Sequence, residues 1–161
     1  MMDTTAFDRQ VAGYTYARNN IEKITAGLDK NTDGIYFVSH SMGAAFAFGM
    51  EIYLISQGWH VRSSVFLNAY QAMSMNVSHK YDNYVIHVDY QNTNDPVLNY
   101  ADYNAPITGN IDLRIRYEAP TSWESAHRYP IDIGNRFWDD LKRGKNGNYQ
   151  YFKSFLKTKT W

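Results

Sequence analysis

Apolar residues in this chain recur with helical spacing in some segments and form strand-like runs in others. Residues 8–28 have the helical spacing and lead into the polar turn DKNTDG, so a helix is expected there. Its apolar face comprises Val11, Ala17, Ile21, Ile24 and Leu28. The β-rich run 35–38 predicts a strand, and the segment beyond it predicts a second helix that ends at Gly58. The buried face expected for that helix comprises Ala45, Phe48, Ile52 and Ile55.

Three further strands are predicted at 61–69, 84–90 and 111–117, the last with alternating apolar and charged residues. Helical patterns at 134–143 and 149–158 complete the chain. Because helices or long connections separate the strands, the pattern favours a mainly parallel sheet flanked by helices, which is a three-layer α/β architecture. The large aromatic residues assigned to its core are Trp59, Phe66, Trp138 and Phe152.

Composition limits this architecture to one domain, because 161 residues with 44% hydrophobic residues can bury one sizeable core but hardly two. Basic and acidic residues both number 16, so net charge favours neither nucleic acid nor an anionic membrane surface as a partner. Cysteine is absent, which excludes disulfides and thiolate metal sites. The first ten residues do not resemble a secretory signal, and the longest apolar run, 43–50, is too short to span a membrane. We therefore expect one soluble domain over 1–161.

The segment 35–55 places a serine at the junction between a predicted strand and a predicted helix. The strand runs directly into the letters SHSMG, residues 39–43, and an alanine-rich segment follows with no spacer. A nucleophile elbow needs small residues on both sides of the serine, because the turn packs strand closely against helix. Ser39 and Gly43 meet that need, although the usual G-x-S-x-G pattern has glycine in place of Ser39. The alternative is that Ser41 is only a polar residue at a bend.

A serine hydroxyl is a poor nucleophile unless a histidine takes its proton and a carboxylate orients that histidine. The chain supplies both after Ser41. Asp95 follows the third predicted strand, and His127 lies in a predicted loop beyond the fourth. Because the carboxyl ends of parallel strands meet at one edge of a sheet, the three residues are expected to converge there as a catalytic triad.

Other histidines are weaker candidates for the base. His40 precedes the serine and is expected to pack or hydrogen-bond beside the site, so it is a pocket candidate. His87 alternates with apolar neighbours inside a strand and is expected in the core, and His60 and His79 have no neighbours that would orient a base. No pair of histidines has metal-ligand spacing with an acid, so neither a metal nor a cofactor is predicted.

Two further residues are candidates at the same edge of the sheet. Asp89 is the alternative acid, but it lies within the third predicted strand, whereas the preferred Asp95 lies beyond that strand. Tyr70 comes just after the second predicted strand, in the run NAYQAM, so it would lie near the edge where the triad is expected. We therefore keep Tyr70 as a candidate for the pocket wall.

With this order and spacing, the residues resemble the α/β-hydrolases, and among them the serine lipases and esterases with GHSxG-type elbows. The run NTNDPV looks like the acid loop of class 3 lipases, and ESAHRYPI is similar to their histidine loop. The runs VSHSMGAAFAFGM, QGWHV, YQNTNDPV and HRYPI also resemble lipase-like domains at the carboxyl ends of bacterial Rhs-type and polymorphic-toxin proteins. The resemblance covers roughly residues 20–140 and only the carboxyl half of the family's fold.

The resemblance implies a serine hydrolase that cleaves a small-molecule or lipid carboxylic ester without a cofactor. Ser41 would attack the carbonyl, His127 would accept and return the proton, and Asp95 would orient His127. The family's oxyanion hole takes one N–H from the residue after the nucleophile, here Met42, and one from a loop after an earlier strand that we do not expect in this chain. Three explanations stay open: another segment donates, the chain is part of a larger protein, or the triad is impaired.

Two alternative functions follow from the same residues. Losing one oxyanion donor typically costs about 100- to 1000-fold in rate. A chain with an incomplete oxyanion hole would therefore suit a non-catalytic interaction domain that keeps the hydrolase fold. An amidase would apply the same triad to a different bond, because a Ser-His-Asp triad serves both esters and amides.

Overall fold

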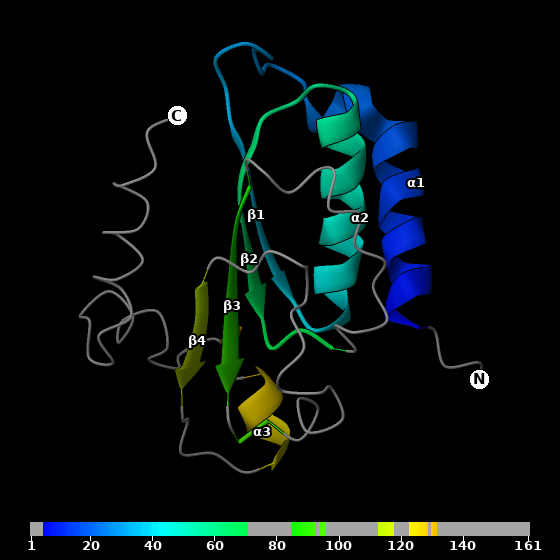
Figure 1. Cartoon of the computed structure of the whole chain (residues 1–161). Helices are drawn as coiled ribbons and strands as arrows, with labels where there is room; N and C mark the ends of the chain where they lie inside the picture. Colours follow the sequence, from blue (N-terminus) through cyan, green and yellow to red (C-terminus); the bar gives the residue numbers. More distant parts are fainter. Residues whose placement is uncertain are drawn as a thin grey trace.

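A parallel sheet with helices on one face forms the described part of the molecule (Figure 1). The computed structural model describes residues 5–70, 85–92, 94–95, 113–117, 123–128 and 130–131. The elements run α1 (Ala6–Ile24), β1 (Ile35–His40), α2 (Met42–Ser56), β2 (Val61–Leu67), β3 (Ile86–Asn92), β4 (Leu113–Tyr117) and α3 (Trp123–Arg128). The strands lie in the order β1-β2-β3-β4, and every neighbouring pair is parallel. The chain is therefore an α/β protein with an open parallel sheet, as the sequence predicts.

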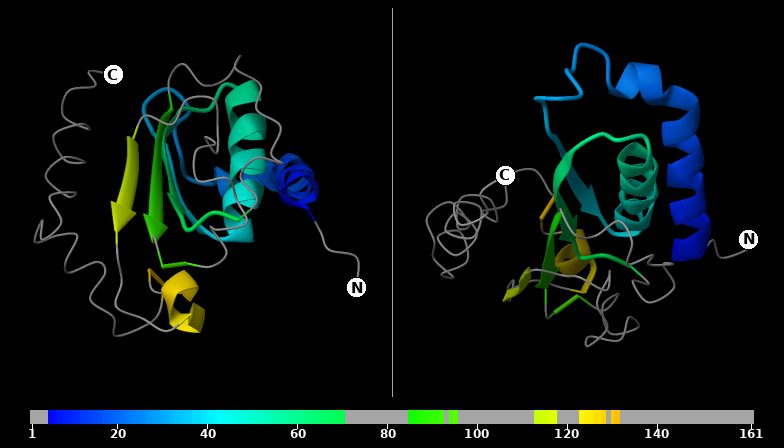
Figure 2. Two further views of the ribbon diagram at one scale, coloured as in Figure 1. Left: turned by 60° about the horizontal axis from the view of Figure 1, so that its bottom comes forward. Right: turned by 45° about the horizontal axis from the view of Figure 1, so that its top comes forward.

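The register of the sheet brings the carboxyl ends of its strands level with one another. His40 pairs with Leu67, and Leu67 pairs with Tyr90. Residues that follow β1, β2 and β3 therefore share one edge, and Figures 1 and 2 show α3 beside that edge. The predicted helices at 134–143 and 149–158, and with them the expected third layer, lie outside the described residues.

Helix α2 lies between the sheet and α1 (Figure 2). It is therefore buried on more than one side, with Ala44, Ala45, Ala47, Phe48, Gly49, Glu51 and Leu54 all buried. Phe66 of β2 packs against Phe48 in one core cluster, as predicted. Trp59 is only partly buried and packs against a second cluster built on Leu54 and Val61. The other two predicted core aromatics lie outside the described residues.

Helices α1 and α2 approach each other closely at two glycines. A Cβ atom on Gly13 would lie 1.9 Å from the carbonyl oxygen of Phe46, and one on Gly49 would lie 1.9 Å from that of Gln10. The buried residues of α1 are accordingly Ala6, Gln10, Gly13 and Ala17. The predicted apolar face was wrong in part, since Val11 and Leu28 are exposed. Small residues decide the contact because they let the two backbones meet.

The ends of both helices follow local sequence chemistry. Thr5 and Asp8 form a capping box at the start of α1, in which the Thr5 hydroxyl accepts from the Asp8 N–H at 3.1 Å. The Thr5 hydroxyl and backbone N–H both donate to the Asp8 carboxylate and lower its pKa. Gly58 follows α2 with a φ of 78°, the left-handed conformation predicted for a helix end.

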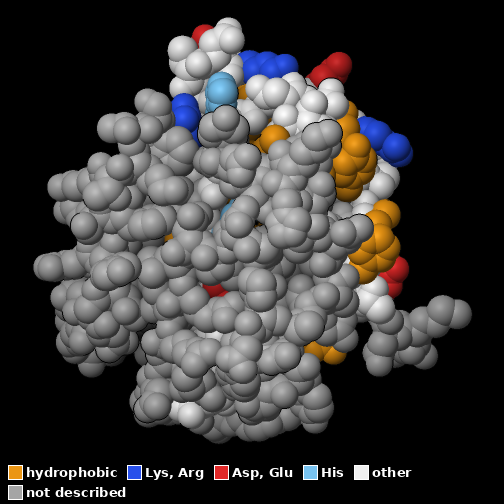
Figure 3. All heavy atoms as spheres, in the orientation of Figure 1, with side chains coloured by type: hydrophobic (Ala, Val, Ile, Leu, Met, Phe, Trp, Pro, Cys, Tyr) orange, Lys and Arg blue, Asp and Glu red, His pale blue; other side chains and the backbone are white. Residues whose placement is uncertain are grey.

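Several hydrophobic side chains of α1 are exposed, and Figure 3 shows hydrophobic groups at the surface on that side of the molecule. The exposed side chains of α1 are Phe7, Val11, Tyr14 and Tyr16. None of the helices in the described ranges has both the length and the apolar character needed to cross a membrane. This agrees with the short apolar runs of the sequence.

Candidate active site

Ser41 occupies the sharp turn between β1 and α2, with no residue between strand and helix except itself. Its φ of 53° and ψ of −130° lie in a region that residues with a side chain rarely adopt. Two backbone hydrogen bonds hold the turn. The Ser41 N–H donates to the Leu67 carbonyl at 3.0 Å, and the Ala44 N–H donates to the Ser41 carbonyl at 3.0 Å. The strained backbone expected of a nucleophile elbow is therefore present.

The close packing expected at the elbow is not found at Gly43. A Cβ atom there would meet no atom of the described residues within 4 Å, apart from its chain neighbours and its own helix backbone. Gly43 is therefore not required by contact with the strand, and the sequence argument for that position was wrong. Ser39, in β1, donates its hydroxyl to the Val65 carbonyl at 3.3 Å. The tight approach of α2 occurs instead at Gly49, against α1.

Asp95 and His127 meet at the carboxyl edge of the sheet although 32 residues separate them. His127 Nδ1 lies 2.6 Å from Asp95 Oδ2, and Asp95 is fully buried while His127 is 19% exposed. Because an ionised carboxylate only accepts hydrogen bonds, the neutral ring carries its proton on Nδ1 and leaves Nε2 as a free acceptor. That tautomer is the one a general base needs. His127 lies in the short helix α3 rather than in the predicted loop.

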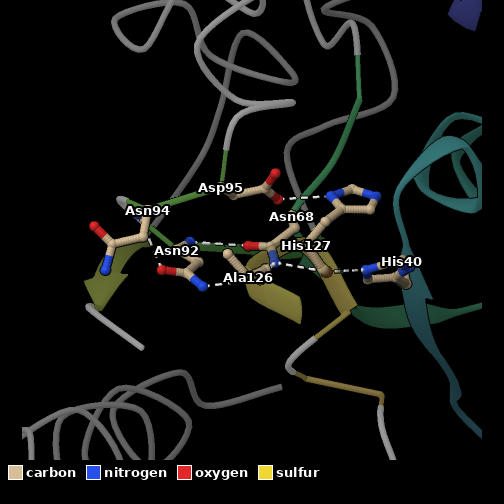
Figure 4. Close-up of polar contacts among 7 residues, drawn as sticks. All are labelled: His40, Asn68, Asn92, Asn94, Asp95, Ala126 and His127. Carbon is tan, nitrogen blue, oxygen red and sulfur yellow. Dashed lines mark hydrogen bonds and ion pairs between the residues drawn. The ribbon is translucent and has the colours of Figure 1, made fainter. Parts of the chain in front are cut away.

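The His127 ring also lies beside the residue that precedes the elbow serine. The ring centroids of His40 and His127 are 4.7 Å apart, and His40 Nε2 donates to the His127 carbonyl at 2.7 Å (Figure 4). His40 thus hydrogen-bonds beside the site, as the sequence analysis expects. Within the described residues, the Ser41 hydroxyl makes no hydrogen bond to the His127 ring. Such contacts are often long before substrate binds.

Two buried asparagines, which the sequence analysis missed, connect this edge. Asn68 follows β2 and donates to the His127 carbonyl at 3.0 Å, and Asn92 ends β3 and donates to the Ala126 carbonyl at 2.8 Å. Asn92 also accepts the Asp95 N–H on its backbone carbonyl at 2.9 Å. The sequence pattern that could have identified Asn68 and Asn92 is the one that indicated Asp95, namely a polar residue at the carboxyl end of a predicted strand.

The competing acid and histidine have partners elsewhere. Asp89 is buried within β3 and accepts from the Gln91 side chain at 2.7 Å, whereas the His127 ring contacts Asp95. His87 is fully buried in the core, as predicted, and its Nε2 lies 2.8 Å from the carboxylate of Glu51 on α2. A hydroxyl on β2, that of Ser64, also donates to this carboxylate. This buried cluster is separate from the candidate site.

The N-terminus of α2 supplies one candidate oxyanion donor. Met42 is the first residue of the helix, so its N–H has no partner within the helix and lies at the positive end of the helix dipole. Tyr70 follows β2, and its N–H approaches the Ser41 carbonyl at 3.4 Å. Tyr70 therefore adjoins the elbow.

Among the residues that the structure describes, no group of three or more histidine, aspartate or glutamate side chains could hold a metal ion. A comparison with protein-family models gives no match, and a comparison with curated proteins gives none either.

Proposed function

We propose that this chain is a serine hydrolase that cleaves a carboxylic ester of a small molecule or lipid. The observation that carries the proposal is the 2.6 Å contact between His127 Nδ1 and the buried Asp95 carboxylate, at the sheet edge that also bears the elbow serine. A buried carboxylate that orients an imidazole is the supporting half of a catalytic triad. The remaining member of a triad is the nucleophile, and the strained backbone of Ser41 at a strand-to-helix turn is typical of a nucleophilic serine.

In this mechanism Ser41 attacks the ester carbonyl, and its proton passes to His127 Nε2. The resulting imidazolium is stabilised by Asp95 through the Nδ1–H, and it returns the proton to the leaving alcohol. The Met42 N–H supports the negative charge on the carbonyl oxygen, aided by the N-terminus of α2. Water then attacks the acyl-enzyme by the same route, which releases the acid and regenerates Ser41.

A fluorophosphonate probe tests the nucleophile directly. We expect covalent labelling of the wild-type chain at Ser41, located by peptide mapping, and no labelling of Ser41→Ala. Ser56→Ala is the matched control, because Ser56 lies at the far end of α2 with its hydroxyl bonded to the Tyr53 carbonyl at 2.6 Å. Absence of labelling in a folded wild-type sample would favour the non-catalytic interaction domain. Paired p-nitrophenyl ester and anilide substrates then distinguish an esterase from an amidase.

A further inference from the structure

The candidate base sits on a helix too short to hold itself in place. Helix α3 has six residues, Trp123–Arg128, and isolated helices of that length are not stable in water. The position of the His127 ring therefore depends on contacts between α3 and the sheet. Among the described residues, side chains from the sheet donate hydrogen bonds to two backbone carbonyls of α3, those of Ala126 and His127.

Three side chains from three neighbouring strand ends donate to these carbonyls (Figure 4). His40, at the end of β1, donates to the His127 carbonyl. Asn68, after β2, donates to the His127 carbonyl at 3.0 Å and is 3.3 Å from that of Ala126. Asn92, at the end of β3, donates to the Ala126 carbonyl at 2.8 Å. The three strand ends together thus hold two successive carbonyls of α3, and Asn68 reaches both of them.

The two asparagines are fixed by bonds to each other as well as to α3. Both are fully buried, and the Oδ1 atom of Asn68 accepts the Asn92 N–H at 2.8 Å. With its oxygen on that N–H, the Asn68 amide must turn its NH₂ group toward the carbonyls of α3. Asn68 also has a φ of 47°, a left-handed conformation in which asparagine is enriched. The Asn68 amide thus supplies an acceptor and a donor at the same time.

Asn92 links the same network to the acid. Its backbone carbonyl accepts the Asp95 N–H at 2.9 Å, and its Oδ1 atom accepts the Asn94 N–H at 3.1 Å. One residue therefore shapes the turn that carries Asp95 and also holds the helix that carries His127. The distance between acid and base depends on this shared support.

We propose that Asn68 and Asn92 are positioning residues, which hold the His127 ring against Asp95 by binding the backbone carbonyls of Ala126 and His127. The role as positioning residues for catalysis rests on the proposed hydrolase function, but the effect on the imidazole does not. Asn68→Asp is the sharpest perturbation, because it keeps the shape of the side chain and turns an acceptor oxygen toward two carbonyl oxygens. Asn19→Asp, on the exposed surface of α1, is the matched control for the same chemical change.

Imidazole ¹H–¹⁵N NMR provides the readout that a purely structural role would not move. At a pH that keeps the ring neutral, the wild-type chain and Asn19→Asp should show His127 protonated on Nδ1, with the signal assigned by its loss in His127→Ala. Asn68→Asp should shift the ring toward the Nε2–H tautomer that a free imidazole favours. If Asn68→Asp does not fold, Asn92→Ala removes the second donor and is read in the same way. A folded variant with the Nδ1–H tautomer unchanged overturns the proposal.

Labelling of Ser41 separates this inference from the proposed function. A misplacement of a catalytic group by about 1 Å can cost roughly 100-fold in rate. We therefore expect Asn68→Asp to label with fluorophosphonate about 10- to 100-fold more slowly than the control, and kcat to fall more than KM rises. A tautomer shift in a chain whose wild type never labels would retain the positioning role and remove the hydrolase. If the wild type labels and Asn68→Asp keeps both the tautomer and the labelling rate, the hydrolase is retained and the positioning role is removed.

Discussion

The close crossing of α1 and α2 determines whether replacing a glycine there raises or lowers the stability of the chain. In an ordinary helix, replacing glycine by alanine stabilises the chain by up to about 1 kcal/mol, because alanine loses less backbone entropy on folding. Gly49→Ala should do the opposite here. Its Cβ atom would lie 1.9 Å from the Gln10 carbonyl oxygen and 2.8 Å from the Tyr14 nitrogen, and both are backbone atoms of α1.

The clash cannot be relieved by a side-chain rotation, so the two helices must move apart. Cβ atoms essentially never approach other atoms closer than 3.0 Å, which requires a separation of about 1 Å at the crossing. Overpacking of this kind costs about 1–3 kcal/mol, and a backbone clash belongs at the upper end of that range. After subtraction of the helix-propensity gain, Gly49→Ala should destabilise the chain by about 2 kcal/mol.

Urea denaturation followed by circular dichroism measures this change, and the midpoint should fall with the m-value unchanged. Gly43→Ala in the same helix is the control, because its Cβ would meet nothing within 4 Å among the described atoms and should be neutral or slightly stabilising. Gly13→Ala produces the reciprocal clash with Phe46, so the double variant should cost less than the sum of the two single changes. A Gly49→Ala chain as stable as Gly43→Ala would refute the close crossing.

Three further predictions concern the site and the core. Ser41→Ala and His127→Ala should each reduce ester turnover by about 10⁴-fold or more with the fold intact, and the double variant should be no slower, since triad members act as a unit; additive losses would argue against the triad. His87→Ala should cost about 3–5 kcal/mol in urea denaturation, because it leaves the buried Glu51 carboxyl without its imidazole partner, and a loss under about 1 kcal/mol would contradict that pairing. Burial raises the pKa of Tyr90 from 10.0 to about 12, so the folded chain keeps a proton that the unfolded chain loses in this range. The contribution of Tyr90 to the free energy of unfolding is complete below pH 10, and about 2 kcal/mol of it is lost as the pH rises to 12. Tyr90→Phe should abolish that part of the pH dependence.

Local patterns in the sequence were sufficient for most of the element order. The first two helices, all four strands and the parallel sheet follow from apolar periodicity and from turn residues, because these signals act over a few neighbouring positions. The same reasoning located Ser41 at a strand-to-helix junction and Asp95 beyond β3. Parallel strands then require their carboxyl ends to share an edge, so the meeting of Asp95 with His127 was predictable from topology alone.

Tertiary structure decided the features that depend on contacts between distant segments. Helical periodicity did not indicate that α1 buries its small residues rather than Val11, since the choice depends on how closely α2 can approach. It also concealed the roles of Asn68 and Asn92, because a polar residue after a strand has the same local pattern whether it faces solvent or holds another chain segment. Hydrogen bonds of this kind join residues more than 30 positions apart, and no local periodicity encodes such partners.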